Sequence, residues 1–222
     1  MLFWESKLIH KMRGKTFVPF LHFVGDEKTD DGKMFHVMVM DLLGPSLEDL
    51  FKYCGQKFSV KTVCMLGHVM LDQIRYVHGK SFVHLNVTPS NFRIGTGKEK
   101  NIVYLTKFNA AKKYTVSNTR KHVEQQQGLT SNPNPSFSSV NSHMGTTLSR
   151  RDDLESLGFV LIYFLRGSLP WHKFNKGLKT KNRKQLYGKV VEMKVQTPVR
   201  YLCKGFPKAF EHYLEYCQKL QF

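Results

Sequence analysis

The sequence predicts an α+β protein in which a small mixed part precedes a larger, mainly helical part. Three observations favour this class. Two short runs rich in β-branched and aromatic residues flank a polar, glycine-bounded turn near the amino end, which is typical of a hairpin. Beyond them, apolar residues recur every three or four positions over long segments, as they do in helices. The 222 residues, of which 41% are hydrophobic, suffice for a sizeable core.

The amino-terminal elements are predicted to be a helix and then a hairpin. Residues 3–12 favour a helix because their apolar members fall on one face, namely Trp4, Leu8, Ile9 and Met12. Residues 16–24 and 34–40 are predicted strands, and residues 25–33 form a polar turn between them. A short helix is predicted from Ser46 to Phe51, because a serine N-cap followed by acidic residues stabilises a first helical turn.

The middle of the chain contains the longest helical pattern. It runs from Lys61 to His78, and Gly79 follows as the predicted C-cap. Residues 92–94 and 102–105 flank a glycine-containing turn, so they predict a second short hairpin. Serine, threonine, asparagine, glutamine and proline dominate residues 115–150, which predicts a loop.

Two helices are predicted in the carboxy-terminal part. Residues 149–164 form a capped, largely apolar segment of the kind that lies inside a core. Residues 206–220 are amphipathic and predict a helix with one buried face. The order of elements is therefore a helix, a small sheet and then mostly helices.

The chain is strongly basic, with a formal net charge of +17. Such an excess attracts nucleic acid, acidic or phosphorylated peptides and anionic membrane surfaces, but composition alone does not separate these from a solvated surface without a partner. The four cysteines lack metal-site spacing and are expected to be reduced thiols of an intracellular protein, cytoplasmic or nuclear. We expect no secretory signal and no membrane partner, since no apolar run approaches the ~18 residues of a span.

Four blocks of the sequence resemble casein kinase 1, a family of serine/threonine protein kinases. They are Asp41-Leu-Leu-Gly-Pro-Ser-Leu-Glu-Asp-Leu-Phe51, Ser149-Arg-Arg-Asp-Asp-Leu-Glu-Ser-Leu-Gly158, Tyr163-Phe-Leu-Arg-Gly-Ser-Leu-Pro-Trp171 and Leu202-Cys-Lys-Gly-Phe-Pro207. The likeness begins near Glu5 and follows the family's order to Phe222. It implies a protein-kinase-like fold with a truncated small β-lobe, residues 1–43, and a mainly helical C-terminal lobe, residues 44–222. The family's glycine-rich loop and nucleotide-binding lysine would precede Glu5 and have no counterpart in the sequence.

The segment His84-Leu-Asn-Val-Thr-Pro-Ser-Asn91 has the spacing of the protein-kinase catalytic loop, H-R-D-x-x-x-x-N. The resemblance implies that Asn86 replaces the catalytic aspartate and that Thr88 replaces the lysine that steadies the transferred phosphate. An amide is not a base, and a threonine carries no charge. Both positions are therefore expected to be vestigial and inactive.

The resemblance also aligns Lys107-Phe-Asn109 with the family's Asp-Phe-Gly, so Lys107 replaces a magnesium-binding carboxylate. Two like unit charges ~4 Å apart repel by about 4 kcal/mol at an effective dielectric constant of about 20. Asn91, the family's other metal ligand, is retained. The hinge that borders the nucleotide would contain Met40, Leu42 and Leu43. We therefore expect a vestigial nucleotide site with no metal and no cofactor, where the intact family holds ATP and magnesium.

Five further residues receive structural roles from the resemblance. Glu5 corresponds to the glutamate of the small lobe's helix, and Asp153 corresponds to the aspartate that ties down the catalytic-loop backbone. A hydrophobic spine between the lobes would contain Ile9, His84 and Phe108. These roles concern the shape of the molecule and need no catalytic chemistry.

A lysine-rich segment follows the apolar helix of residues 149–164. Its basic residues are Lys179, Lys181, Arg183 and Lys184. They form a predicted anion-binding patch, and a solvated loop without a partner is an equally good interpretation.

These observations predict a casein kinase 1-like pseudokinase that does not transfer phosphate. It would act by binding, as a scaffold, as a competitor of an active relative, or by presenting its basic lobe to an acidic or phosphorylated protein. One alternative is a weakly active kinase for acidic or primed substrates, with Asp41 or Glu124 recruited to the metal. Two others are the product of a degenerate gene copy without selected activity, and non-specific binding of nucleic acid by charge.

Overall fold

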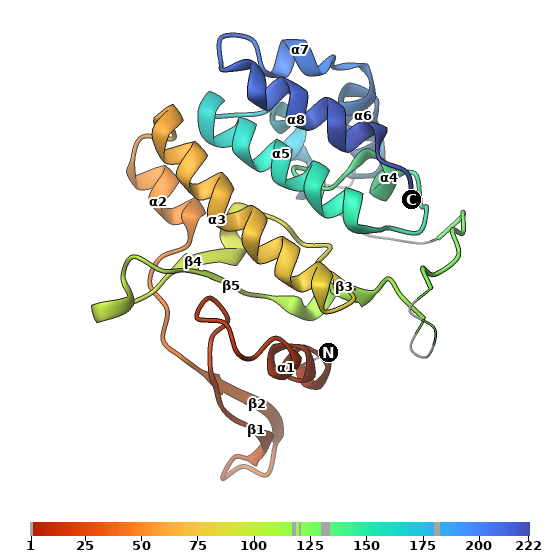
Figure 1. The fold of residues 1–222 in the computed structure, drawn as a ribbon. Helices are drawn as coiled ribbons and strands as arrows, with labels where there is room; N and C mark the ends of the chain where they lie inside the picture. The colour runs from red at the N-terminus through yellow and green to blue at the C-terminus, as the bar shows by residue number, and fades with distance from the viewer. Residues whose placement is uncertain (1, 117–118, 120, 130–133, 180–182) are drawn as a thin grey trace.

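The computed structural model describes residues 2–116, 119, 121–129, 134–179 and 183–222, and the side chains of residues 175–184 lie outside this description. Helices and small antiparallel sheets alternate along the chain, which confirms the predicted α+β class. Helix α1 and the hairpin β1–β2 lie at one end of the molecule (Figure 1). Helices α5, α7 and α8 lie at the other end, with β4 and β5 between the two ends.

The elements have the following bounds. The α-helices are α1 Leu2–Lys11, α2 Leu47–Tyr53, α3 Val60–Gly79, α4 Val140–His143, α5 Arg150–Arg166, α6 Arg183–Gln196, α7 Val199–Leu202 and α8 Lys208–Lys219. The strands are β1 Leu21–Lys28, β2 Met34–Met40, β3 Phe82–Val83, β4 Phe92–Ile94, β5 Val103–Leu105 and β6 Lys112–Lys113. The 3-10 helices are η1 Pro89–Asn91, η2 Gly97–Glu99, η3 Phe108–Ala110 and η4 Pro170–Lys179. Strands pair as β1–β2, β3–β6 and β4–β5.

The first hairpin begins later than the sequence predicted. Strand β1 starts at Leu21 rather than at residue 16, and it includes residues 25–28 that were expected to turn. Each of these polar residues pairs with β2, from Gly25 opposite Val37 onward, and this pairing outweighs their low preference for strands. Residues 16–20 are not part of strand β1. The carbonyl of Phe17 instead accepts a hydrogen bond from the Leu105 N–H, at 3.0 Å.

Local capping explains where two of the helices begin. Ser46 and Asp49 form a reciprocal capping box before α2, as the serine signal predicted. At the start of α5 the Asp152 carboxylate accepts a hydrogen bond from the Ser149 N–H, at 2.7 Å. The C-cap of α3 differs from the prediction, because Gly79 is the last helical residue and Lys80 is the cap.

The core lies where α5 packs against α3 on one side and α8 on the other. Apolar side chains of α5 from Leu157 to Leu165 are buried, which agrees with the predicted core helix. Glycine allows the close approach of α5 and α8, since a Cβ at Gly158 would lie 2.3 Å from Cδ2 of Leu214. No helix within the described ranges has the length and apolar character that a membrane crossing demands.

Lys194 on α6 is a charged side chain enclosed by this helical part, with 5% of its surface exposed. Its Nζ donates to the Ser138 carbonyl at 2.7 Å and lies 3.0 Å from Nε2 of His143. The same nitrogen sits 5.3 Å from the centre of the Phe159 ring and 5.2 Å from that of Trp171. The lysine thereby ties α6 to the segment before α4, a connection that spans more than fifty residues of sequence.

Replacing Gly158 with alanine is expected to destabilise the fold by about 1–3 kcal/mol, the usual effect of overpacking a core. Leu214 is fully buried, so any shift that accommodates the new methyl group must displace packed neighbours. The matched control is Gly188→Ala on α6, where a Cβ meets no described atom within 4 Å. That change should be neutral or stabilise the helix by about 0.5–1 kcal/mol. Urea unfolding measures both, and equal stability of the two variants would contradict the close α5–α8 contact.

Replacing Lys194 with methionine is expected to make the free energy of unfolding rise less steeply with pH above pH 7. Burial lowers the pKa of Lys194 from 10.5 to about 7, and the Glu155 carboxylate opposes this shift. Between these values the unfolded chain holds a proton that the folded chain lacks, so the free energy of unfolding rises with pH, by up to about 1.4 kcal/mol per unit. Below about 7 both states are protonated and the contribution is constant.

Urea unfolding at several pH values from 7 to 9 measures this slope in the wild type and in Lys194→Met. The exposed Lys98 provides the control, because Lys98→Met removes the same charge from the surface. A slope that is identical in the wild type and in Lys194→Met would show that Lys194 keeps its ordinary pKa in the folded protein.

Candidate functional site

The carboxylate of Asp153, on the first turn of α5, holds the loop that follows β3. One oxygen accepts from the backbone N–H of His84 and the other from that of Leu85, both at 2.7 Å. Nε2 of His78, on α3, lies 2.8 Å from the first oxygen. Leu85 has a positive φ of 61°, a conformation that a non-glycine residue adopts at some energetic cost. The three donors therefore fix the backbone of the loop at a strained residue.

Burial opposes ionisation of Asp153, which is 1% exposed. The hydrogen bond and charge of His78 and the His84 N–H nevertheless hold the pKa of Asp153 below its usual value. A buried carboxylate needs such donors because its charge is otherwise unsolvated. The ion is stable in the core only while the loop and α3 keep their places.

His84 turns from this anchor toward η3. Its Nδ1 accepts from the Asn86 N–H at 3.3 Å, so the proton lies on Nε2, which donates to the Thr106 carbonyl at 3.2 Å. Burial lowers the pKa of His84 and keeps its ring neutral. The ring meets Phe108 edge-on with centroids 5.1 Å apart. His84 and Phe108 are both fully buried, and Ile9 on α1 belongs to the same core.

The remaining loop residues hydrogen-bond to one another. Asn91 donates from Nδ2 to the Asn86 carbonyl at 2.7 Å, and its own carbonyl accepts from the N–H and hydroxyl of Thr106. The carbonyl of Thr88 accepts from the Asn91 N–H at 3.0 Å, and Thr88 is buried. Asn91 and Thr88 thus maintain the shape of the loop, and Asn86 takes part through its backbone.

A cleft of ≈ 630 Å³ lies beside this loop, between α1, the end of β2 and the start of η3. We call it the Lys107 cleft. Its lining includes four of the five positions that the resemblance assigned to nucleotide and metal, namely Met40, Leu42, Leu43 and Lys107. Asn91 is buried instead of lining the cleft, and the same holds for Thr88. The cleft therefore combines an apolar edge from β2 with one ammonium group.

Glu5 faces Lys107 from α1. Burial raises the pKa of Glu5, while a hydrogen bond from the Phe108 N–H and the positive charge of Lys107 act against that rise. Helix α1 lies against η3, and Nε1 of Trp4 donates to the Ala111 carbonyl at 3.2 Å. Lys107 itself adopts the left-handed conformation, with φ of 59°. Glu5 is thus hydrogen-bonded to the backbone of the η3 turn and is also influenced by the positive charge of Lys107.

The donors in the Lys107 cleft do not suit a magnesium ion. Magnesium prefers oxygen ligands in octahedral geometry, usually with carboxylates among them. Lys107 offers an ammonium, and the retained Asn91 directs its side-chain nitrogen to the Asn86 carbonyl. Asp41 lines the cleft, but its oxygens accept from the Phe20 N–H at 2.7 Å and contact His22 Nε2 at 2.8 Å. Within the described ranges no three histidine, cysteine or acidic side chains gather as metal ligands.

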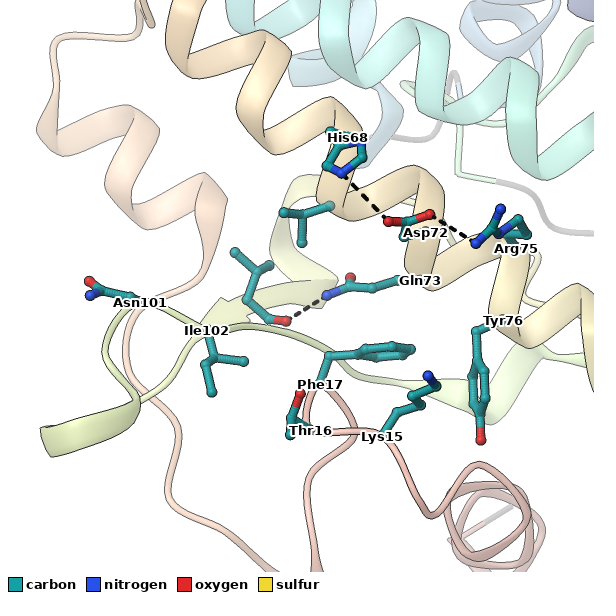
Figure 2. Close-up of a pocket in the computed structure, with 12 residues that line it drawn as sticks. Lys15, Thr16, Phe17, His68, Asp72, Gln73, Arg75, Tyr76, Asn101 and Ile102 are labelled. Carbon is teal, nitrogen blue, oxygen red and sulfur yellow. Dashed lines mark hydrogen bonds and ion pairs between the residues drawn. The ribbon is translucent and has the colours of Figure 1, made fainter.

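A different cavity, of ≈ 540 Å³, lies between α3, β5 and the segment of residues 15–17 (Figure 2). Gln73 extends from α3, and its Nε2 donates to the Val103 carbonyl at 2.5 Å. Asp72 pairs with His68 at 3.7 Å and with Arg75 at 3.5 Å along the same helix. None of the residues predicted to be functional lines this cavity. We therefore retain the Lys107 cleft as the candidate site.

One group of predicted residues is not tested by the structure, and one supporting residue was not predicted. The predicted anion patch of Lys179, Lys181, Arg183 and Lys184 lies outside the described residues and side chains. His78, in contrast, supports Asp153 and was not singled out for that role by the sequence. Residues 78 and 153 are 75 positions apart, and no local pattern connects them.

Replacing Asp153 with asparagine is expected to destabilise the fold by about 2–4 kcal/mol at neutral pH. The amide retains one acceptor and leaves a buried donor facing the loop N–H groups. The control is Asp72→Asn on the exposed side of α3, where breaking a surface ion pair should cost less than about 1 kcal/mol.

The effect of Asp153→Asn should shrink in acid, because a carboxylate with a lowered pKa contributes stability that is lost as pH falls through its folded-state pKa. The difference from the wild type is therefore expected to be complete above the ordinary value of 3.8 and to narrow below it. Unfolding measured at pH 7 and at pH 3 tests this sign. A difference that grows in acid would contradict the ionised state of Asp153.

No family model matches the sequence. A functional proposal therefore depends on the geometry described above. That geometry consists of a loop held by Asp153 and a cleft whose charged lining residues are Glu5, Asp41, Arg93 and Lys107.

Proposed function

We propose that the chain is a catalytically inactive protein with a casein kinase 1-like fold that acts by binding a partner. The observation that carries the proposal is Lys107, an ammonium group in the cleft where a kinase of that family holds a metal-binding carboxylate. The same cleft is lined by the predicted hinge residues Met40, Leu42 and Leu43, and this supports the likeness to a kinase of that family. The anchoring of the loop backbone by Asp153 supports it independently.

Phosphoryl transfer depends on positioning and on neutralising charge around the transferred group. A general base typically contributes ~10²–10⁴-fold, and Asn86 supplies none. Thr88 is buried and uncharged, so it offers no cation to the phosphate. Lys107 repels a divalent cation, and the two carboxylates of the cleft are already engaged, Glu5 by the Phe108 N–H and Asp41 by the Phe20 N–H and His22. The three positions act against catalysis by separate physical routes, which favours a loss of the reaction over a weakened one.

A weakly active kinase is the second candidate because Asp41 lines the Lys107 cleft. Both oxygens of Asp41 are already engaged, by the Phe20 N–H and by His22. Glu124, the other acidic residue considered, is exposed and does not line the cleft. Metal binding at Asp41 would first have to break the two contacts that hold the start of β1 to the end of β2.

The binding partner that best suits the chain is an acidic or phosphorylated protein. The net charge of +17 attracts such a partner over distances of about the Debye length, ~8–10 Å in physiological salt. Competition with an active relative for a shared scaffold would use the same surface. We propose no metal-dependent step and no nucleotide cofactor in this activity.

Thermal unfolding with and without Mg-ATP is expected to show no magnesium-dependent stabilisation. A ligand present at ~100 times its dissociation constant adds about 2.7 kcal/mol to the native state. Restoring carboxylates with the double change Asn86→Asp and Lys107→Asp should create or increase a magnesium-dependent shift. Lys98→Asp is the control, since it changes the charge of an exposed residue that does not line the cleft.

A phosphotransfer assay on an acidic phosphopeptide completes this test. We expect no turnover by the wild-type chain. Turnover with Mg-ATP that disappears in Asn86→Ala would overturn the proposal and favour the weakly active kinase.

A further inference from the structure

A third cleft, of ≈ 480 Å³, opens where the end of α3 approaches the start of α5. We call it the Lys80–Arg150 cleft. Its lining includes the basic side chains Lys80, His122 and Arg150, together with Ser81, Tyr114 and Thr115. No carboxylate is present among the described residues that line it. The cleft is therefore positively charged and rich in hydrogen-bond donors.

Aromatic rings hold the two permanent cations in place. The guanidinium carbon of Arg150 lies 4.8 Å from the centre of the Tyr114 ring, and Nζ of Lys80 lies 5.3 Å from that of Tyr76. Tyr114 is itself fixed, since its hydroxyl donates to the His78 carbonyl at 2.8 Å. Neither cation has a carboxylate within salt-bridge distance in the described part of the chain. Their charges are thus positioned without being neutralised.

His122 adds an unpaired nitrogen to the same cleft. Its Nδ1 lies 2.9 Å from the Val123 carbonyl and therefore carries a proton. Its Nε2 is buried and has no hydrogen-bond partner among the described residues. The ring is held between Tyr114 and Phe222, with centroid distances of 5.5 and 4.4 Å. An unpaired buried polar atom is unfavourable, and a hydrogen-bonding ligand in the cleft would satisfy it.

The carbonyls at the end of α3 do not compete for this space. The Lys80 N–H donates to the Tyr76 carbonyl at 3.1 Å, and the Ser81 N–H donates to the His78 carbonyl at 2.9 Å. The carbonyls of Tyr76 and His78 therefore already have hydrogen-bond donors. On the opposite side, Arg150 is the first helical residue of α5, where the helix dipole favours an anion.

We propose that the Lys80–Arg150 cleft binds a phosphate monoester, and specifically a phosphoserine or phosphothreonine side chain of a partner protein. A monoester carries nearly two negative charges and three acceptor oxygens at one point, which suits a cleft lined by three basic residues. A nucleic-acid backbone distributes single charges along an extended line and fits a long groove better than a compact cleft. The inference rests on the proposed binding function and assigns the phosphorylated partner's contact to residues outside the Lys107 cleft.

The test measures binding of a phosphoserine peptide to the full chain by calorimetry at constant ionic strength. Arg150→Gln and Lys80→Gln each remove one cation, and His122→Asn keeps a donor for the Val123 carbonyl while removing Nε2. Each change is expected to weaken binding at least about tenfold, the usual effect of losing one charge-assisted hydrogen bond. Lys98→Gln, which removes the charge of an exposed residue that does not line the cleft, should leave the affinity nearly unchanged. Circular dichroism verifies that each variant is folded.

The comparison ligands decide between sources of the same chemistry. The peptide without phosphate, inorganic phosphate alone and a single-stranded oligonucleotide should all bind at least about tenfold more weakly than the phosphopeptide. Equal affinity for inorganic phosphate or for the oligonucleotide would overturn the assignment to a phosphorylated protein. If Lys98→Gln and Arg150→Gln weakened phosphopeptide binding equally, the interaction would be a non-specific attraction between opposite charges and the proposed site would be wrong.

These results are separate from those at Lys107. If Arg150→Gln did not weaken phosphopeptide binding, the prediction that magnesium does not stabilise the chain would still stand. Turnover with Mg-ATP would show that the chain is catalytically active, but it would not change the measured contribution of Arg150 to phosphopeptide affinity.

Discussion

The buried carboxylate of Asp153 is the interaction on which the surrounding structure depends. Among the described residues it has no lysine or arginine partner, and it is stabilised by two backbone N–H groups and His78. Because an unsatisfied buried charge is very unfavourable, α3, α5 and the loop after β3 must adopt one mutual arrangement. His84 is then directed toward Phe108, and η3 in turn supports α1 through Glu5 and Trp4.

This rigid arrangement surrounds chemically different clefts. The Lys107 cleft has an apolar edge and the facing charges of Glu5 and Lys107, which suits neither a divalent cation nor proton abstraction. The Lys80–Arg150 cleft lies near the same Asp153 anchor, since its lining includes the end of α3 and the first residue of α5. A scaffold without catalytic groups can still position cations precisely enough for recognition, because positioning derives from packing and not from reactivity.

The sequence predicted the helices well where a local signal marks them. The cap at Ser46 and the acidic first turn after it act within four residues, and so does the cap of α5 at Ser149. The apolar run of α5 is long enough to indicate burial without knowledge of its neighbours. The second hairpin was also predicted from its own residues, because β4 and β5 are joined by a short turn. The α+β class follows from these elements alone.

Tertiary structure decided the features that require residues distant in the chain. The start of β1 moved to Leu21 because Phe17 bonds to Leu105, and Lys194 lost contact with solvent because α6 packs over Ser138. The candidate clefts likewise depend on such meetings, since Glu5 meets Lys107 and Lys80 meets Arg150 only in the folded chain. Sequence periodicity reports the environment of a residue over a few neighbours, whereas burial, pairing and charge compensation are determined by which distant segments pack together.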